Sequence, residues 1–451
     1  MSPRRTLFAV LAALLACGAA HAADAPKQKP NVLFLFTDDQ RADTVHALGN
    51  ATIQTPNLDR LVESGFAFRN AYCMGGNVPA VCLPSRTMLL SGRSLFRLPS
   101  LKPESPNFPR ALNDAGYETY HHGKRGNTPQ IIQKDFTHNL YLQNDDKERT
   151  SGFPGKEIAD DAIQFLKDRK KDKPFFLYLA FANPHDPRVV NKEWRDKYDE
   201  AKMPLPKNYR PFHSFNNGDL LVRDEKLAPW PRTEAEVRKH LTDYYGVITY
   251  LDMQLGRILQ ALKDSGDYDD TLIIFSSDHG LALGSHGLFG KQNIYEDGMK
   301  VPLIFAGTGV PKGRSDAFVY LYDIFPTVCD FAGAKVPDTL DGKSLRPVIR
   351  GDAKQVRDAV FLAYRTFQRS VRQGDWKLIR YPQVDKTQLF NLKDDPHETK
   401  DLAADPKHAD KVKELLTLLA KQQKEYGDTL PLTVDKPQKA EVDLSFFKDQ
   451  K

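Results

Sequence analysis

The sequence is poor in cysteine, and this scarcity excludes small domains stabilised by disulfides or by zinc. Its 451 residues hold four cysteines, at positions 17, 73, 82 and 329, and the first lies in a segment that we expect to be removed. Three remaining thiols do not make a disulfide framework. No cysteine pair and no cysteine–histidine pair has the spacing of zinc ligands. The presence of Cys82 in a polar segment therefore needs a chemical explanation.

A strong net charge and long apolar runs are also lacking. The formal net charge is +5, and removal of the basic residues at positions 4 and 5 leaves +3. This bias is too weak to indicate nucleic acid as a partner. The apolar run at residues 7–16 is too short to span a bilayer, and no other long run exists, so we expect no stable membrane insertion.

The N-terminus has the pattern of an export signal. The basic positions 4 and 5 precede the apolar run, and Ala20-His21-Ala22 supplies a small-x-small cleavage site. We therefore assign residues 1–22 to a signal peptide and expect a periplasmic or secreted protein. Two alternatives are an uncleaved anchor and lipoprotein processing at Cys17, because residues 14–18 loosely resemble a lipobox.

Short apolar runs alternate with helical patterns through most of the chain. The predicted strands are residues 31–36, 175–182, 271–277 and 301–306, and the predicted helices are residues 55–64, 158–168 and 234–265. Thr55 is expected to cap the first of these helices, with Pro56 at its first position. Strands that are apolar on both faces and alternate with helices predict an α/β fold, with a large, mostly parallel or mixed sheet covered by helices on both faces.

The last hundred residues have a different pattern. Short strands with turn signals are predicted at residues 360–364, 369–372, 376–381 and 388–392, followed by an amphipathic helix at residues 409–426. We therefore expect a catalytic domain at residues 23–355 and a smaller subdomain at residues 356–451, with an antiparallel sheet, a helix and a polar tail. Residues 191–231, rich in Pro and Asn, are expected to form an insertion near the active-site rim, with disorder as the alternative.

Polar side chains follow three of the predicted strands. Asp38-Asp39 follows the first strand, His185 follows the second, and Asp278-His279 follows the third. The ends of parallel strands gather at one edge of a sheet, where ligands bind, so the three clusters should converge. Adjacent carboxylates suit a hard divalent cation, although helix capping or a solvated turn would account for each cluster alone.

Cys82 precedes a predicted helix, and Arg86 lies four residues further on. Residues at this spacing share one face of a helix. From the residues alone, Cys82 is a buried structural thiol, a catalytic thiolate or something less common.

The segment Cys82-Leu83-Pro84-Ser85-Arg86, followed by Leu90-Ser91-Gly92-Arg93, resembles the signature of type I, formylglycine-dependent sulfatases of the alkaline phosphatase superfamily. The resemblance extends over nearly the whole mature chain, through the opening at residues 31–40, Gly123-Lys124, the turn at 183–187, the segment at 277–280 and Gly290-Lys291. The chain looks most similar to bacterial carbohydrate sulfatases and iduronate-2-sulfatase-like enzymes.

This resemblance implies a cofactor, a modification and a set of site residues. A maturation enzyme would oxidise Cys82 to formylglycine, whose hydrated aldehyde offers one hydroxyl to attack sulfur and a second to expel sulfate. One calcium ion per chain would be held by Asp38, Asp39, Asp278, His279 and the modified Cys82. Arg86 and Lys124 would hold the formylglycine and the sulfate oxygens, and His185 and Lys291 would serve the sulfate and the leaving alcohol, with His185 as general acid.

One departure from the family concerns an imidazole. Many relatives have His two residues after the position of Lys124, where this chain has Gly126. His121 or His122 would replace it, or the nucleophile is activated differently. The predicted substrate contacts are His122, Arg188, His286, Arg365 and Arg369.

The resulting hypothesis is a sulfuric ester hydrolase that releases sulfate from a sulfate monoester on a sulfated saccharide. Alternatives within the superfamily are a phosphonate monoester or phosphodiester hydrolase and an aryl or choline sulfatase. A non-catalytic binding protein on the same scaffold is a third alternative, although it predicts loss of Cys82, Arg86 or Lys124, and all three are present.

Overall fold

The computed structural model describes residues 29–126, 129–142 and 145–442. The predicted signal peptide lies outside these residues. Among the described helices, none is long and apolar enough to cross a membrane.

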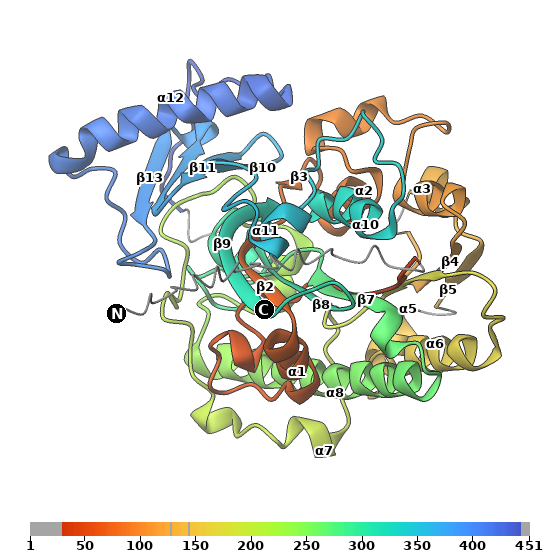
Figure 1. The fold of residues 1–451 in the computed structure, drawn as a ribbon. Coiled ribbons are helices and arrows are strands. Elements are labelled where there is room, and N and C mark those ends of the chain that lie inside the picture. The colour runs from red at the N-terminus through yellow and green to blue at the C-terminus, as the bar shows by residue number, and fades with distance from the viewer. Residues whose placement is uncertain (1–28, 127–128, 143–144, 443–451) are drawn as a thin grey trace, which may run out of the picture.

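An eight-stranded sheet forms the centre of the molecule (Figure 1). Its order is β5 (His138–Tyr141), β4 (Glu118–Gly123), β6 (Phe175–Ala180), β1 (Asn31–Thr37), β7 (Thr271–Ser277), β8 (Lys300–Gly307), β2 (Phe66–Tyr72) and β9 (Gly313–Tyr320). The strands from β5 to β7 all pair in parallel, whereas β8 pairs antiparallel with both of its neighbours. The predicted mixed, mostly parallel sheet is therefore confirmed.

Helices cover both faces of this sheet. One face packs against α1 (Pro56–Ser64), α6 (Lys156–Asp168) and α8 (Glu234–Asp264), and the other against α2 (Cys82–Ser91), α3 (Phe108–Asp114) and α10 (Ile324–Ala332). Shorter helices are α4 (Gln130–Gln133), α5 (Asp145–Thr150), α7 (Lys192–Arg195), α9 (Glu296–Met299) and α11 (Arg346–Arg350).

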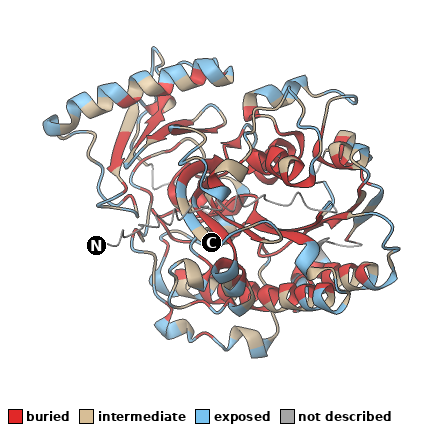
Figure 2. Ribbon diagram, in the orientation of Figure 1, coloured by how far each residue is buried: buried red, intermediate tan, exposed pale blue. Residues whose placement is uncertain are grey.

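Strand β1 explains why the core has two halves. Val32, Phe34 and Phe36 point into one buried cluster, whereas Leu33 and Leu35 point into the other. This is the two-residue alternation of an extended strand, and a strand covered on both faces must be apolar at every position. The central strands are accordingly buried along their length (Figure 2).

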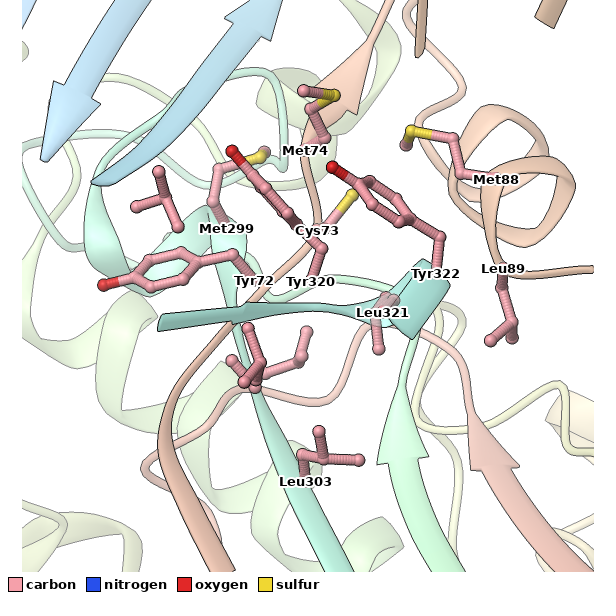
Figure 3. Packing of buried hydrophobic residues seen from close by; sticks show 14 of the residues in the cluster. Tyr72, Cys73, Met74, Met88, Leu89, Met299, Leu303, Tyr320, Leu321 and Tyr322 are labelled. Atoms are coloured by element: carbon pink, nitrogen blue, oxygen red, sulfur yellow. The ribbon is translucent and has the colours of Figure 1, made fainter. Parts of the chain in front are cut away.

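The buried cluster that contains Val32, Phe34 and Phe36 extends to a second, five-stranded sheet in the C-terminal part of the chain. Figure 3 shows part of it, where the rings of Tyr320 and Tyr322 lie beside Cys73 and Met88. The two tyrosine rings stack with centroids 4.8 Å apart. Cys73 is a buried free thiol, as is Cys329, so neither forms a disulfide.

Thr55 and Pro56 begin α1 as predicted, but Thr55 does not cap it through its side chain. Thr55 occupies the N-cap position, but its hydroxyl makes no capping bond to the helix backbone. The hydroxyl instead donates to Asp59 Oδ1 at 3.1 Å and accepts the backbone N–H of His46 at 2.9 Å. The side chain is thus used to join the preceding loop to the first turn.

The C-terminal region forms the predicted antiparallel sheet and helix. Strands β10 (Ala359–Tyr364), β11 (Gln368–Gln373), β12 (Trp376–Tyr381) and β13 (Lys386–Asn391) pair in sequence, and α12 (Ala409–Tyr426) packs on them. A fifth strand, β3 (Gly75–Gly76), pairs with β10 and comes from the first part of the chain. The smaller sheet therefore contains residues from both of the predicted domains. The domain boundary at residue 355 stays a prediction.

Candidate active site

Four adjacent parallel strands bring the predicted polar residues to one edge of the sheet. Lys124 follows β4, His185 follows β6, Asp38 and Asp39 follow β1, and Asp278 follows β7. The predicted convergence is therefore met, and its cause is the common direction of these strands. The backbone of Asp38 donates to Asn183 O at 3.1 Å, which ties the end of β1 to the segment after β6.

Cys82 begins helix α2 and lies at the centre of this cluster. Its Sγ is 3.3 Å from Asp38 Oδ1 and 3.2 Å from His279 Nε2. Lys291 Nζ donates to the same sulfur at 3.1 Å. One turn further along α2, Arg86 Nε donates to Asp278 Oδ2 at 3.1 Å. The helix thus places a sulfur and a guanidinium group on the same side, as their spacing predicts.

The surroundings of Cys82 disfavour a simple thiolate nucleophile. Burial and the neighbouring Asp38 raise the pKa of the Cys82 thiol well above its usual value, although Lys291 opposes them. A reactive cysteine needs the opposite shift, since the thiolate is the nucleophile. An unmodified Cys82 would therefore stay protonated at neutral pH.

Three buried carboxylates and three buried or nearly buried cations face one another here. Asp38, Asp39 and Asp278 are at most 2% exposed. Arg86 lies 3.4 Å from Asp38, Lys124 Nζ donates to Asp38 Oδ2 at 3.0 Å, and Lys291 Nζ donates to Asp39 Oδ1 at 2.9 Å. The six charges cancel, so a bound divalent cation would leave the site positive and suited to an anionic group.

The donor set could hold a metal ion. Ligand atoms of Asp38, Asp39, Cys82 and His279 all lie within 4.8 Å of one another, and every one of these residues is buried. Carboxylate oxygens are what a hard cation prefers. Asp39 is held at a φ of 68°, a strained conformation for a residue with a side chain, which is typical of functional sites.

Opposite charges set the protonation states of this cluster. Burial alone would raise the pKa of Asp38, but Lys124 and Arg86 hold that pKa well below its usual value. Burial would lower the pKa of Lys291, but Asp39 raises it well above the usual value. Both groups are therefore charged at neutral pH.

His185 differs from these groups because it is neutral. Burial and Lys291 lower the pKa of its ring to about 3. Its Nδ1 lies 2.7 Å from the backbone oxygen of Asp186, so Nδ1 carries the proton and Nε2 faces Asp39, 4.0 Å away. The expected role as general acid needs a protonated ring, whereas Lys291 already holds a proton beside Cys82.

Neither His121 nor His122 takes the place of the imidazole missing at Gly126. His122 faces α6, where its Nδ1 lies 3.1 Å from Asp161 Oδ2. His121 is bonded to Asn139 at 2.9 Å within the core. The imidazole that does approach Cys82 belongs to His279.

Three of the other predicted substrate contacts, Arg369, Arg365 and His286, are engaged by partners within the protein. Arg369 forms a buried ion pair with Asp428 at 2.6 Å, and Arg365 pairs with Asp219 at 3.1 Å. His286 stacks on Tyr295 with centroids 3.8 Å apart. The Arg188 guanidinium packs over Tyr244 at 5.5 Å, and the Tyr244 hydroxyl donates to the backbone oxygen of Asp39, so the substrate contact expected of Arg188 stays a prediction.

Sequence reasoning missed Arg223 and Asp224, which come from the predicted insertion. Asp224 lies 4.0 Å from Lys291 Nζ, and Arg223 pairs with Asp186. The only signal was the charged run at residues 223–226 within a segment rich in Pro and Asn. Without the fold, nothing distinguished that run from a solvated loop.

The fold and the charges of the site are those of an enzyme that binds an anionic group of its substrate. A family model described as "Sulfatase" matches residues 30–334, and one described as "N-sulphoglucosamine sulphohydrolase, C-terminal" matches residues 284–425. The chain therefore belongs to the sulfatase family, and it is a sulfuric ester hydrolase.

Relatives with names cover almost the full chain. An N-acetylglucosamine-6-O-sulfatase of Bacteroides thetaiotaomicron is 28% identical, over 94% of this chain and 92% of that protein. An arylsulfatase of Clostridium perfringens is 28% identical, over 87% of this chain and 94% of that protein.

Solved structures show the same architecture. A structure in complex with its substrate D-glucosamine-2-N,6-O-disulfate superposes with a TM-score of 0.76 and 25% identity, covering 90% of this chain and 99% of the other. A phosphonate monoester hydrolase of Agrobacterium radiobacter gives 0.73 at 24% identity, covering 88% and 96%, which shows the shared fold alone.

Proposed function

We propose that this protein removes sulfate from a sulfated saccharide, with formylglycine made from Cys82 as the nucleophile and one calcium ion as cofactor. The observation that carries the proposal is the position of Cys82 Sγ, within 3.3 Å of Asp38, His279 and Lys291 at the start of α2. The saccharide is suggested by the named sulfatase relative and by the glucosamine disulfate in the similar structure.

The proposed calcium ligands are Asp38, Asp39, Asp278, His279 and the modified residue 82. When bound, calcium would supply a positive charge that polarises a sulfate oxygen. Formylglycine would supply, as its hydrate, a hydroxyl that attacks sulfur and a second one that allows sulfate to leave. A hydrolytic cycle needs this second hydroxyl, because a serine ester at the same place would have no group to expel the sulfate.

The chain's own cations orient and neutralise the substrate in this proposal. Arg86, one turn beyond Cys82 in α2, donates to Asp278, and Lys124 donates to Asp38. Both would bind sulfate oxygens as charge moves toward the leaving oxygen. Because these groups are already fixed by carboxylates, little reorganisation is needed during the reaction.

Lys291 and His185 are the residues that we assign to the leaving group. Lys291 keeps its proton and lies 3.1 Å from Cys82 Sγ, so we assign it the donation of a hydrogen bond or a proton to the leaving alcohol. His185 Nε2, unprotonated in the free protein, would accept a hydrogen bond from the substrate. A proton taken up on substrate binding would restore the general-acid role expected of His185.

The runner-up reaction is hydrolysis of a phosphonate monoester or phosphodiester, because phosphorus and sulfur esters present similar oxygens and a phosphonate hydrolase shares the fold. An aryl or choline sulfatase is the alternative within sulfate chemistry. Export to the periplasm or the medium and conversion of Cys82 by a formylglycine-generating enzyme belong to the same proposal.

A substrate panel tests these alternatives. The protein, produced together with a formylglycine-generating system, is assayed for sulfate or phosphate release from sulfated saccharides, aryl sulfates, choline sulfate and an aryl phosphate. We expect the highest kcat/KM on one sulfated saccharide and none in Cys82→Ala. Preference for the phosphoester or for a non-sugar sulfate would overturn the assignment.

A further inference from the structure

The segment Arg223-Asp224-Glu225 contacts the catalytic loops although it lies in the insertion at residues 191–231. It forms the start of the short helix η4 (Arg223–Leu227). Asp224 and Glu225 are buried, at 6% and 2% exposure, although the side chain of the preceding Arg223 is 60% exposed. Buried carboxylates need partners, and each of these two has partners in a catalytic loop.

Glu225 fixes the backbone that precedes Lys291. Its two carboxylate oxygens accept the backbone N–H groups of Phe289 at 2.9 Å and Gly290 at 2.8 Å. The charge of Glu225 is balanced by Arg232, which is wholly buried and donates to it at 2.8 Å. These two consecutive N–H groups therefore have a fixed direction, and so does the side chain that follows them.

Asp224 holds the residues on the other side of Lys291. Its Oδ2 accepts Gln292 Nε2 at 2.7 Å and lies 4.0 Å from Lys291 Nζ. The same Nε2 also donates to Pro79 O at 3.0 Å, in the segment that leads to Cys82. Asp224 thereby links the Lys291 loop to the loop of the nucleophile.

Arg223 completes the connection with the third catalytic segment. Its Nη1 donates to Asp224 Oδ1 at 2.6 Å and to Asp186 Oδ1 at 3.3 Å, and its Nη2 also donates to Asp186. Asp186 directly follows His185. A bidentate guanidinium contact of this kind fixes geometry as well as charge.

Gly290 gives an independent sign of how tightly these parts fit. A Cβ at this position would lie 2.2 Å from Gln292 Oε1 and 2.9 Å from Asp224 Cβ. The loop can approach Asp224 this closely only because residue 290 has no side chain.

We propose that Arg223, Asp224 and Glu225 are positioning residues that hold His185 and Lys291 in register with the nucleophile at position 82. The inference rests on the proposed function for the roles of His185 and Lys291. Since displacement of a catalytic group by about 1 Å can reduce turnover by about 10²-fold, loss of the segment should act mainly on kcat.

The test compares Arg223→Gln, Glu225→Gln and Gly290→Ala with wild type and with Glu200→Gln. Glu200 lies in the same insertion and pairs with Arg195, away from the catalytic loops. Arg223 has a 60% exposed side chain, so its variant should fold. Gly290→Ala alters the same contacts without removing a charge.

Two readouts are measured on the calcium-loaded, converted protein. Hydrogen exchange of the amides of residues 289 and 290 should become faster in Glu225→Gln and Gly290→Ala, and stay unchanged in Glu200→Gln. We expect kcat to fall at least about tenfold in Arg223→Gln, Glu225→Gln and Gly290→Ala, with KM within about threefold of wild type and calcium content unaltered.

Unchanged amide exchange would overturn the inference, and so would faster exchange with undiminished kcat, or a loss explained by calcium release. If wild type itself released no sulfate, the proposed function would fail separately, and the exchange experiment would still decide whether this segment holds the loop.

Discussion

Lys291→Met removes an ammonium group that donates to Asp39 Oδ1 at 2.9 Å and to Cys82 Sγ at 3.1 Å. If Lys291 donates to the leaving oxygen, the loss of kcat in Lys291→Met should be larger for a leaving group that needs a proton more. A preorganised donor at a developing charge contributes about 2.7–4 kcal/mol, or about 10²–10³ in kcat. We expect a loss of that size on a sulfated saccharide, whose alkoxide leaves poorly without a proton.

A nitrophenyl sulfate needs far less help, because its phenolate is a good leaving group. On this substrate we expect kcat to fall less than about tenfold in Lys291→Met. This smaller loss would reflect weaker neutralisation of the sulfate charge. Both substrates are assayed at saturating calcium, with the converted fraction of residue 82 determined by mass spectrometry. Lys239→Met, at an exposed position of α8, is the matched control. Equal losses on the two substrates would refute the assigned role.

Three further predictions concern the metal, acid stability and the C-terminal sheet. Asp38→Ala should lose bound calcium, measured by elemental analysis, together with all sulfate release, and excess EDTA should inactivate wild type; turnover unaffected by EDTA would contradict the metal assignment. Burial lowers the pKa of His121 to about 3 and that of His122 to about 4, so the unfolded chain takes up protons near pH 6.5 that the folded one does not. The free energy of unfolding should then fall as the pH drops from 6.5 to 4, by up to about 1.4 kcal/mol per pH unit for each group; a melting temperature that rises over this range would argue against it. Arg369→Met breaks the buried pair with Asp428 and should lower the free energy of unfolding by about 3–5 kcal/mol without altering KM, whereas a raised KM in a stable variant would make Arg369 a substrate contact.

The sequence predicted the structure correctly where a residue pattern is compatible with only one local structure. The wholly apolar run at β1 predicts a strand covered on both faces, and polar residues after parallel strands must meet at one edge. Asp38, His185 and Asp278 could therefore be grouped before the fold was known. The family resemblance, rather than spacing, supplied the expected chemistry of Cys82.

Side chains whose role depends on distant partners could not be placed in this way. Arg365 and Arg369 look like anion-binding residues in the sequence, but Asp219 and Asp428, far along the chain, neutralise both. His185 is expected to be a general acid until its burial and the neighbouring charge of Lys291, which together lower its pKa, are known. In each case the missing information was long-range packing, which sets burial and therefore charge.

The measurement that tests the central claim most directly relates turnover to the chemical state of residue 82. Protein is prepared with and without a formylglycine-generating system, the converted fraction of the Cys82 peptide is determined by mass spectrometry, and sulfate release is measured in excess calcium. We predict that turnover per molecule rises in proportion to the converted fraction and is absent in fully unconverted protein. Equal turnover in converted and unconverted preparations would contradict the account and return Cys82 to the role of an ordinary thiol.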